Sequence, residues 1–208
     1  MFNDRHDAGK KLADKLGRYR GKDAVVLALP RGGVVTGYEI ARALKLPLDI
    51  IVVRKVGHPA SPEYAICAVD EKGTLVCNED EAASIDQTWL KEEIKRQGQE
   101  ARRRVRAYRG ERKETQIAGK TAIIVDDGIA TGLTMRLAVR SVRTQKPRKI
   151  IAAVPIAPPG AASALTAEGT DEVVVLEPPE EFLGAVGAHY IEFEQVEDNE
   201  VIRLLRSS

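Results

Sequence analysis

Cysteines, aromatic residues and excess charge are all scarce in this chain of 208 residues. It has two cysteines, Cys67 and Cys77, too few for a disulfide framework or a structural zinc site. Aromatic residues make up 4%, and 32 basic residues are balanced by 31 acidic ones, giving a formal net charge of +1. This near-neutral balance argues against nucleic acid as the main partner.

Long apolar runs are missing as well. No stretch reaches the roughly 20 residues that span a membrane, and the N-terminal segment 1–7 lacks the apolar region of a secretory signal. We therefore expect a cytoplasmic protein without a membrane partner, folded as a single domain over residues 1–208. In a reducing cytoplasm, we expect Cys67 and Cys77 to be small buried hydrophobic residues and not a disulfide.

Apolar runs alternate with amphipathic stretches along most of the chain, which predicts an α/β fold with a doubly wound, mostly parallel sheet. The expected strands are 24–29, 48–53, 121–125, 149–154 and 172–176, and the expected helices lie around 8–19, 38–44 and 161–168. Two segments depart from this alternation. They are an insertion at about 65–118 and a tail from about 177 to 208. The insertion is predicted to hold a hairpin, with strands 66–69 and 74–77 that place the cysteines opposite each other, and a long polar helix over 80–108.

The strongest functional signal is the run from Ala122 to Thr134, AIIVDDGIATGLT. An apolar strand ends in two adjacent carboxylates, Asp126 and Asp127, and a loop rich in Gly, Thr and Ala leads into a helical pattern. Such a turn aims backbone N–H groups and the positive end of a helix at one point, which suits a phosphate. Because two carboxylates would repel a bare phosphate, the ligand should also offer hydroxyls or a cation. A phosphorylated sugar with a free diol fits, particularly with Mg²⁺.

This run resembles the signature of the type I phosphoribosyltransferases, which bind phosphoribosyl pyrophosphate (PRPP). The resemblance implies that Asp126 and Asp127 hold the ribose 2′- and 3′-hydroxyls, with Mg²⁺ bound through PRPP and both acids as candidate ligands. It assigns the 5′-phosphate to the loop residues Gly128, Ile129, Ala130, Thr131, Gly132, Leu133 and Thr134. An ordinary Asp-Gly turn is the alternative, but the preceding strand and following helix favour the functional interpretation.

A second glycine-bearing loop follows the first expected strand, with Pro30, Arg31, Gly32 and Gly33. Arg31 offers a bidentate fork for phosphate oxygens, and the glycines let the backbone approach closely. Within the family this loop resembles the pyrophosphate loop, where a non-proline peptide bond is often cis. Here the candidate bond is Arg31–Gly32 or a neighbouring one. A surface turn with a solvated arginine is the alternative.

Arg54 and Lys55 follow the next strand, where the family has pyrophosphate-binding cations and the start of a mobile lid. The glycine and prolines of segment 56–64 predict an irregular loop that closes over the substrate and keeps water out. His58 and Glu63 are its titratable groups and could act on an attacking base. An ordinary exposed loop histidine and a pair of surface cations are the alternatives.

The tail loosely resembles the hood of the 6-oxopurine enzymes, so Phe182, Val186 and Tyr190 are candidates for contacting the base. Those enzymes carry an acid at the position of Ala130, and its absence argues against 6-oxopurine chemistry. The arginine-rich stretch 96–113 is interpreted first as a solvated helix face, then as a ligand or subunit contact, and last as a nucleic-acid site.

The resemblance implies a Mg²⁺-dependent phosphoribosyltransferase of nucleotide salvage, which joins a nitrogen of a purine-like base to C1 of PRPP and releases pyrophosphate. Asp126 and Asp127 would favour the cationic ribose, and Arg54 and Lys55, with Arg31, would favour the leaving group. The alternative is a non-catalytic sensor of PRPP or a nucleotide on the same fold. The leaving-group cations favour the enzyme, and a homodimer is compatible with either.

Overall fold

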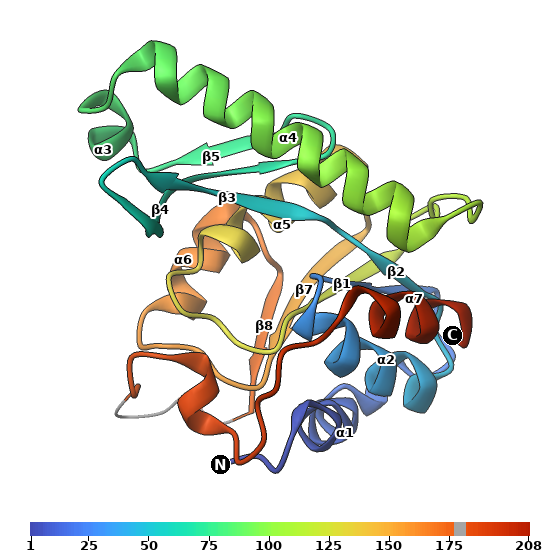
Figure 1. Ribbon diagram of the computed structural model, residues 1–208. Coiled ribbons are helices and arrows are strands. Elements are labelled where there is room, and N and C mark those ends of the chain that lie inside the picture. Colours follow the sequence, from blue (N-terminus) through green and yellow to red (C-terminus); the bar gives the residue numbers. More distant parts are fainter. Residues whose placement is uncertain (177–181) are drawn as a thin grey trace.

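A computed structural model describes residues 1–176 and 182–208. Its centre is a five-stranded sheet in the order β2-β1-β6-β7-β8, in which every neighbouring pair is parallel (Figure 1). This confirms the predicted α/β fold. Within the described residues, no helix is both long and apolar enough to cross a membrane. The strands are β1 Ala24–Ala28, β2 Leu48–Ile50, β6 Thr121–Val125, β7 Lys149–Val154 and β8 Glu172–Val175.

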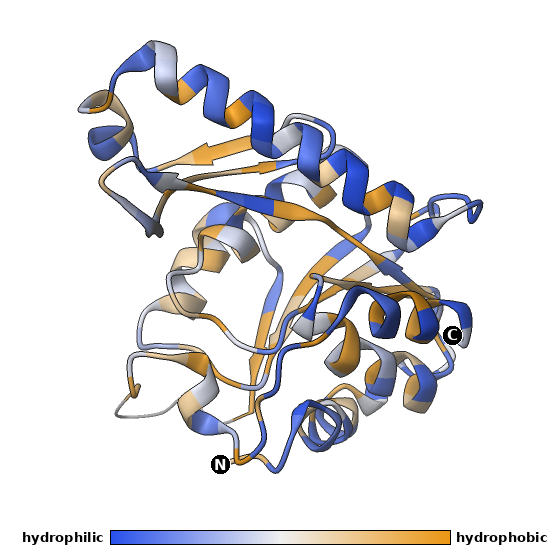
Figure 2. Ribbon diagram, viewed as in Figure 1, coloured by the Kyte–Doolittle hydropathy of each residue, from blue (hydrophilic) through white to orange (hydrophobic). Residues whose placement is uncertain are grey.

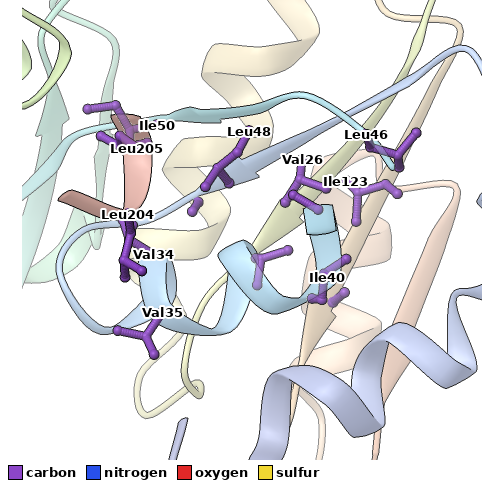
Figure 3. Packing of buried hydrophobic residues seen from close by; sticks show 14 of the residues in the cluster. Val26, Val34, Val35, Ile40, Leu46, Leu48, Ile50, Ile123, Leu204 and Leu205 are labelled. Carbon is purple, nitrogen blue, oxygen red and sulfur yellow. The ribbon is translucent and has the colours of Figure 1, made fainter. Parts of the chain in front are cut away.

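Side chains alternate between the two faces of this sheet, and both faces are covered by helices. Val26 and Ile123 belong to one core cluster, which Figure 3 shows with Ile40 of α2 and Leu204 of α7. Residues one position along, such as Val25, belong to a second cluster with α5 and α6. The central strands are accordingly apolar along their length (Figure 2). The helices are α1 Arg5–Lys15, α2 Gly32–Leu44, α5 Leu133–Thr144, α6 Ala161–Glu168 and α7 Asp198–Arg206, with short 3₁₀ turns at Gly17–Tyr19 and Val186–His189.

The insertion forms a second, three-stranded antiparallel sheet in the order β3-β4-β5. Leu90 of the long helix α4 packs on one face of it with Ile66, while Leu137 of α5 packs on the other with Ala68. Helix α4 therefore runs across the top of the molecule, above the small sheet (Figure 1). The elements are β3 Val53–His58, β4 Ser61–Asp70, β5 Leu75–Cys77, α3 Glu79–Ala83 and α4 Gln87–Arg109.

The prediction of an irregular loop over 56–64 is wrong, because most of this segment belongs to the β3–β4 ladder. The expected strand 48–53 is also divided: β2 ends at Ile50, and β3 starts at Val53 in the other sheet. The ladder is irregular on both sides of Gly57, where a Cβ would lie 2.9 Å from the Cα of Pro62. A ladder tolerates a bulge at a glycine such as Gly57 and a proline near the start of a strand such as Pro62. These two residues therefore did not prevent strand pairing.

Two further expectations for the insertion need correction. The single helix over 80–108 is divided into α3 and α4, because Asp86 starts a new helix, its side chain accepting a hydrogen bond of 2.7 Å from the backbone N–H of Trp89. The hairpin does place Cys67 opposite Cys77, with Cα atoms 4.0 Å apart. The two are joined as a disulfide, however, and are not free thiols, since direct cross-strand pairing brings the two side chains together.

Candidate active site

A cleft of about 660 Å³ lies between the carboxyl ends of the central strands and helix α4. All three loops singled out from the sequence line it, represented by Arg31, Arg54 and Asp126. They meet there because β1 and β6 are parallel neighbours, so the loops that follow them leave the same edge of the sheet. Residues of β3, including Arg54 and Lys55, also line the cleft, and β3 belongs to the three-stranded sheet.

The two acids lie at the end of β6 and contact each other. The backbone N–H of Asp127 donates to Oδ1 of Asp126 at 2.9 Å. Burial, followed by the negative charge of Asp127, raises the pKa of the Asp126 carboxyl well above its ordinary value. Asp127 is held from two sides: its Oδ2 accepts from Nε of Arg5 at 2.7 Å, and its carbonyl oxygen accepts from the hydroxyl of Tyr190 at 2.6 Å.

The loop that follows the acids is only partly available to a ligand. The N–H of Ile129 is already donated to the carbonyl oxygen of Ile156 at 2.9 Å, and the side chain of Leu133 packs in the core against β4. Gly132 precedes α5 with a φ of 80°, a conformation that favours glycine. The first N–H groups of a helix have no partner within it, and Thr134 and Met135 of the first turn of α5 line the cleft. The loop residues that line the cleft are Gly128, Ile129, Ala130, Thr131, Gly132 and Thr134.

The glycine-bearing loop after β1 packs directly on the acids. Its cis peptide bond joins Pro30 to Arg31, one bond before the first-named candidate. A Cβ on Gly32 would lie 2.6 Å from Cγ of Asp127, and a Cβ on Gly33 would lie 2.9 Å from Cα of Asp126. Both glycines are therefore needed for the close approach of the two loops.

The cations of the cleft are incompletely neutralised by protein carboxylates. Arg54 is half-buried and donates from Nε to Oε1 of Gln97 at 3.0 Å. Among the side chains that the structure describes, which exclude those of Glu63 and 177–181, no carboxylate forms an ion pair with it. Burial, and after it the charge of Arg104, lowers the pKa of the Arg54 guanidinium. Arg31 reaches Asp198 of α7 at 3.5 Å, and Lys55 lines the same cleft. We call these three residues, Arg31, Arg54 and Lys55, the cationic corner of the cleft, and their charges suit a multiply charged anion.

Helix α4 supplies a wall of the cleft, whereas the sequence interpretation ranked a solvated face first for its arginine-rich stretch and a ligand or subunit contact second. Of the arginine-rich stretch, Arg103 is a solvated residue, as first expected, with its side chain 61% exposed. Arg104 faces inward at 24% exposed and lines the cleft. A polar face at helical spacing was the available signal, but polarity alone does not separate a solvated face from a cleft wall. The α4 residues that line the cleft are Trp89, Glu93, Arg96, Gln97 and Arg104.

Two of the three tail candidates lie away from the cleft. Val186 lines it and covers Gly128, where a Cβ would lie 2.9 Å from Cγ2 of Val186. Phe182 stacks on His189 with ring centroids 5.5 Å apart, and Tyr190 packs between Phe2 and Phe193 at the base of the acid loop. The start of the predicted hood, 177–181, lies outside the described residues.

His58, a candidate from segment 56–64, lines the cleft. Its ring Nδ1 accepts a hydrogen bond from the backbone N–H of Ala60 at 3.1 Å. The side chain of Glu63 lies outside what the structure describes. Among the residues that the structure describes, no three His, Cys, Asp or Glu side chains are grouped closely enough to hold a metal ion by themselves. Asp126 and Asp127 could hold Mg²⁺ only together with oxygens of a bound substrate, which is the usual arrangement for Mg²⁺ in phosphate sites.

Comparison with known proteins agrees with this geometry. Residues 3–184 match the family model for the phosphoribosyl transferase domain. The chain is 42% identical over 212 residues to "Putative phosphoribosyl transferase Rv0571c" of Mycobacterium tuberculosis, with 99% of this chain but 46% of that protein covered. The chain thus spans about half the length of the curated relatives it matches.

Among solved structures, TT1426 from Thermus thermophilus has a TM-score of 0.83 at 42% identity, covering 100% of this chain and 98% of that one. A hypothetical protein from Neisseria gonorrhoeae with bound ppGpp has a TM-score of 0.51 at 14% identity, covering 100% and 98%. That second likeness concerns the fold alone. By its family match and its 42% identical relatives, the chain belongs to the phosphoribosyl transferase domain family.

Proposed function

We propose that this protein binds PRPP in the cleft and transfers its phosphoribosyl group to a nitrogenous base, releasing pyrophosphate. The observation that carries the proposal is the layout of charge in one cleft. Two adjacent carboxylates lie beside a glycine-bearing loop at a helix N-terminus, opposite a corner of cations. This matches the charge pattern of a sugar diol flanked by a phosphate on one side and a pyrophosphate on the other.

The 5′-phosphate would occupy the start of α5. Thr131 and Thr134 line the cleft there, so their hydroxyls and the backbone N–H groups of this turn can donate to phosphate oxygens. Ile129 contributes no N–H, because its own is already used by Ile156. The adjacent acids would then face the ribose hydroxyls, which can donate to carboxylate oxygens.

The leaving group would occupy the cationic corner. As the bond from C1 to pyrophosphate lengthens, positive charge grows on the ribose ring and negative charge on the departing oxygen. In this proposal Asp126 and Asp127 favour the first charge and the three cations favour the second, and all of these residues line the cleft. The cations are Arg31, Arg54 and Lys55. Bound Mg²⁺ would add Lewis-acid stabilisation of the pyrophosphate. No side chain needs to form a covalent bond with the substrate.

A purine-like base is the proposed acceptor, and the cleft limits how it can be held. Ala130 presents no carboxylate to a base nitrogen, and of the described tail residues, 182–208, only Val186 lines the cleft. The half-buried indole of Trp89 on α4 also lines the cleft and offers an aromatic surface. A planar, largely uncharged base fits these surroundings better than an acidic one.

Release of pyrophosphate tests the proposal directly. Purified protein is incubated with Mg²⁺, PRPP and a panel of purine, pyrimidine and smaller nitrogenous bases, and pyrophosphate is followed with a coupled assay. We expect base-dependent release with at least one purine-like base. PRPP binding without release for every base would favour the sensor, and absence of PRPP binding would contradict both the enzyme and a sensor of PRPP.

A further inference from the structure

Arg5 is a nearly buried cation that contacts one of the two proposed ribose acids from a distant part of the sequence. It lies at the start of α1, 122 positions before Asp127, and its Nε donates to Oδ2 of that residue at 2.7 Å. The two side chains are only 11% and 17% exposed. An ion pair shielded from water in this way is stronger and far less screened by salt than a surface pair.

The guanidinium of Arg5 is fixed by two further contacts. Its Nη1 donates to the carbonyl oxygen of Glu194 at 2.8 Å, and its Cζ lies 3.7 Å from the centre of the Phe193 ring. Nε of Arg5 also closes off the space beside Gly32, where a Cβ would lie 2.8 Å away. Arg5 therefore joins the start of α1, the tail and two cleft loops at one point.

We propose that Arg5 is the positioning residue of the PRPP site: it orients the Asp127 carboxylate toward the ribose and supplies the counter-charge for the acid pair. The inference rests on the proposed function. Arg5 does not line the cleft itself, whereas Asp127 does, so Arg5 acts through Asp127 and not on the substrate. Lysine would keep the charge but lose the planar fork that serves Asp127 and Glu194 together.

Removal of the Arg5 charge changes the electrostatics of the pair. The negative charges of two adjacent carboxylates repel each other, and the charge of Asp127 raises the pKa of buried Asp126. Without Arg5, Asp127 loses the donor that fixes its Oδ2. The carboxylate is then free to turn away from the ribose, and the acid pair loses a cation that is shielded from water.

The test is calorimetric titration of Mg²⁺ and PRPP into the wild type, Arg5→Gln, Arg5→Lys, Asp127→Asn and the Arg5→Gln/Asp127→Asn double variant. Lys10→Gln is the matched control, because it removes a cation from the same helix at an exposed position. All titrations are run under the same buffer conditions, and thermal unfolding reports whether each variant is folded. The Arg5→Lys variant keeps the test usable should Arg5→Gln fail to fold.

We expect Arg5→Gln to weaken PRPP binding by about tenfold or more, the scale of one shielded charge-assisted contact. Arg5→Lys should bind with intermediate affinity, and Lys10→Gln should match the wild type. In the Asp127→Asn background, Arg5→Gln should have little further effect.

Equal PRPP affinity of wild type and Arg5→Gln, or additive losses in the double variant, would overturn the role of Arg5 while leaving the proposed function standing. A wild type that does not bind PRPP under any of these conditions would remove the proposed function and this inference together.

Discussion

Asp126 is a buried carboxyl group beside a second acid, and its ionisation destabilises the ligand-free fold. Its pKa is higher in the folded state than in the unfolded state, so protonation of Asp126 stabilises the fold. This stabilisation is complete below the unfolded pKa of about 3.9 and is lost as the pH rises through the folded pKa. Asp126→Asn cannot ionise. We therefore expect a melting temperature above that of wild type at neutral pH, with the difference vanishing as the pH falls toward 4. A difference that does not change with pH would contradict the burial argument.

The two glycines of the Arg31 loop should respond differently to alanine. At Gly32 the new Cβ meets the ends of two side chains, those of Asp127 and Arg5, which can move aside. At Gly33 it meets backbone atoms, Cα of Asp126 at 2.9 Å and the carbonyl oxygen of Val125 at 2.9 Å. Gly33→Ala should therefore destabilise the fold by about 1–3 kcal/mol, as overpacking does. Gly32→Ala should cost less stability but displace the acid and weaken PRPP binding.

Chemical denaturation and PRPP titration of both alanine variants separate these effects. Gly37→Ala in the same helix is a useful comparison, because its Cβ would meet side-chain carbons of the core and not the site. Equal stability losses at Gly32 and Gly33, with PRPP affinity unchanged in both, would mean that the two loops are not in the contact described here.

Helix α4 presents neighbouring arginines that share one acid and differ in direction. Arg103 and Arg104 donate to the two oxygens of Glu100 at 2.7 and 2.8 Å, but only Arg104 lines the cleft. We expect Arg104→Gln to weaken binding of Mg²⁺-pyrophosphate by about tenfold and Arg103→Gln to change it by less than about twofold. Similar effects of both substitutions would indicate that α4 acts only through its overall charge.

The β3–β4 hairpin replaces the loop expected over 56–64, and its exchange behaviour should follow its ladder. Paired residues such as Val56 and Cys67 are fully buried, whereas the turn at Pro59 and Ala60 is exposed. In hydrogen exchange without ligand, we expect slow exchange along the ladder and fast exchange at Ala60. Rapid exchange along the whole hairpin would contradict this account and restore the expectation of a mobile lid.

At the scale of elements, the sequence analysis correctly predicted the helices and strands whose ends are set by local residue patterns. The strands 121–125 and 149–154 and helix 161–168 agree with the structure in both bounds, because each combines an apolar run with a clear end signal. The break before α4 depends on a single capping residue, Asp86, inside an otherwise continuous polar helix pattern. The β3–β4 hairpin was missed because the bulge at Gly57 of β3 makes room for Pro62 of β4. This adjustment involves two strands and cannot be recognised from either strand alone.

At the scale of the whole molecule, the contacts that assemble the site lie beyond sequence pattern. The strand-end motifs predicted that the acids and Arg31 share one edge of the sheet, and they do. Arg5 reaches Asp127 from 122 positions away, and Asp198 of the last helix accepts from both Arg31 and Tyr108. Such contacts depend on how α1, α4 and α7 pack, and no local spacing encodes that arrangement.

Binding of Mg²⁺ and PRPP to the wild type and to the Asp126→Asn/Asp127→Asn double variant, measured by calorimetry, tests the central claim most directly. The account predicts saturable binding to the wild type and none to the double variant, whose melting temperature should show that it remains folded. Equal affinity of the two proteins, or no binding by the wild type, would contradict the assignment of this cleft as a PRPP site.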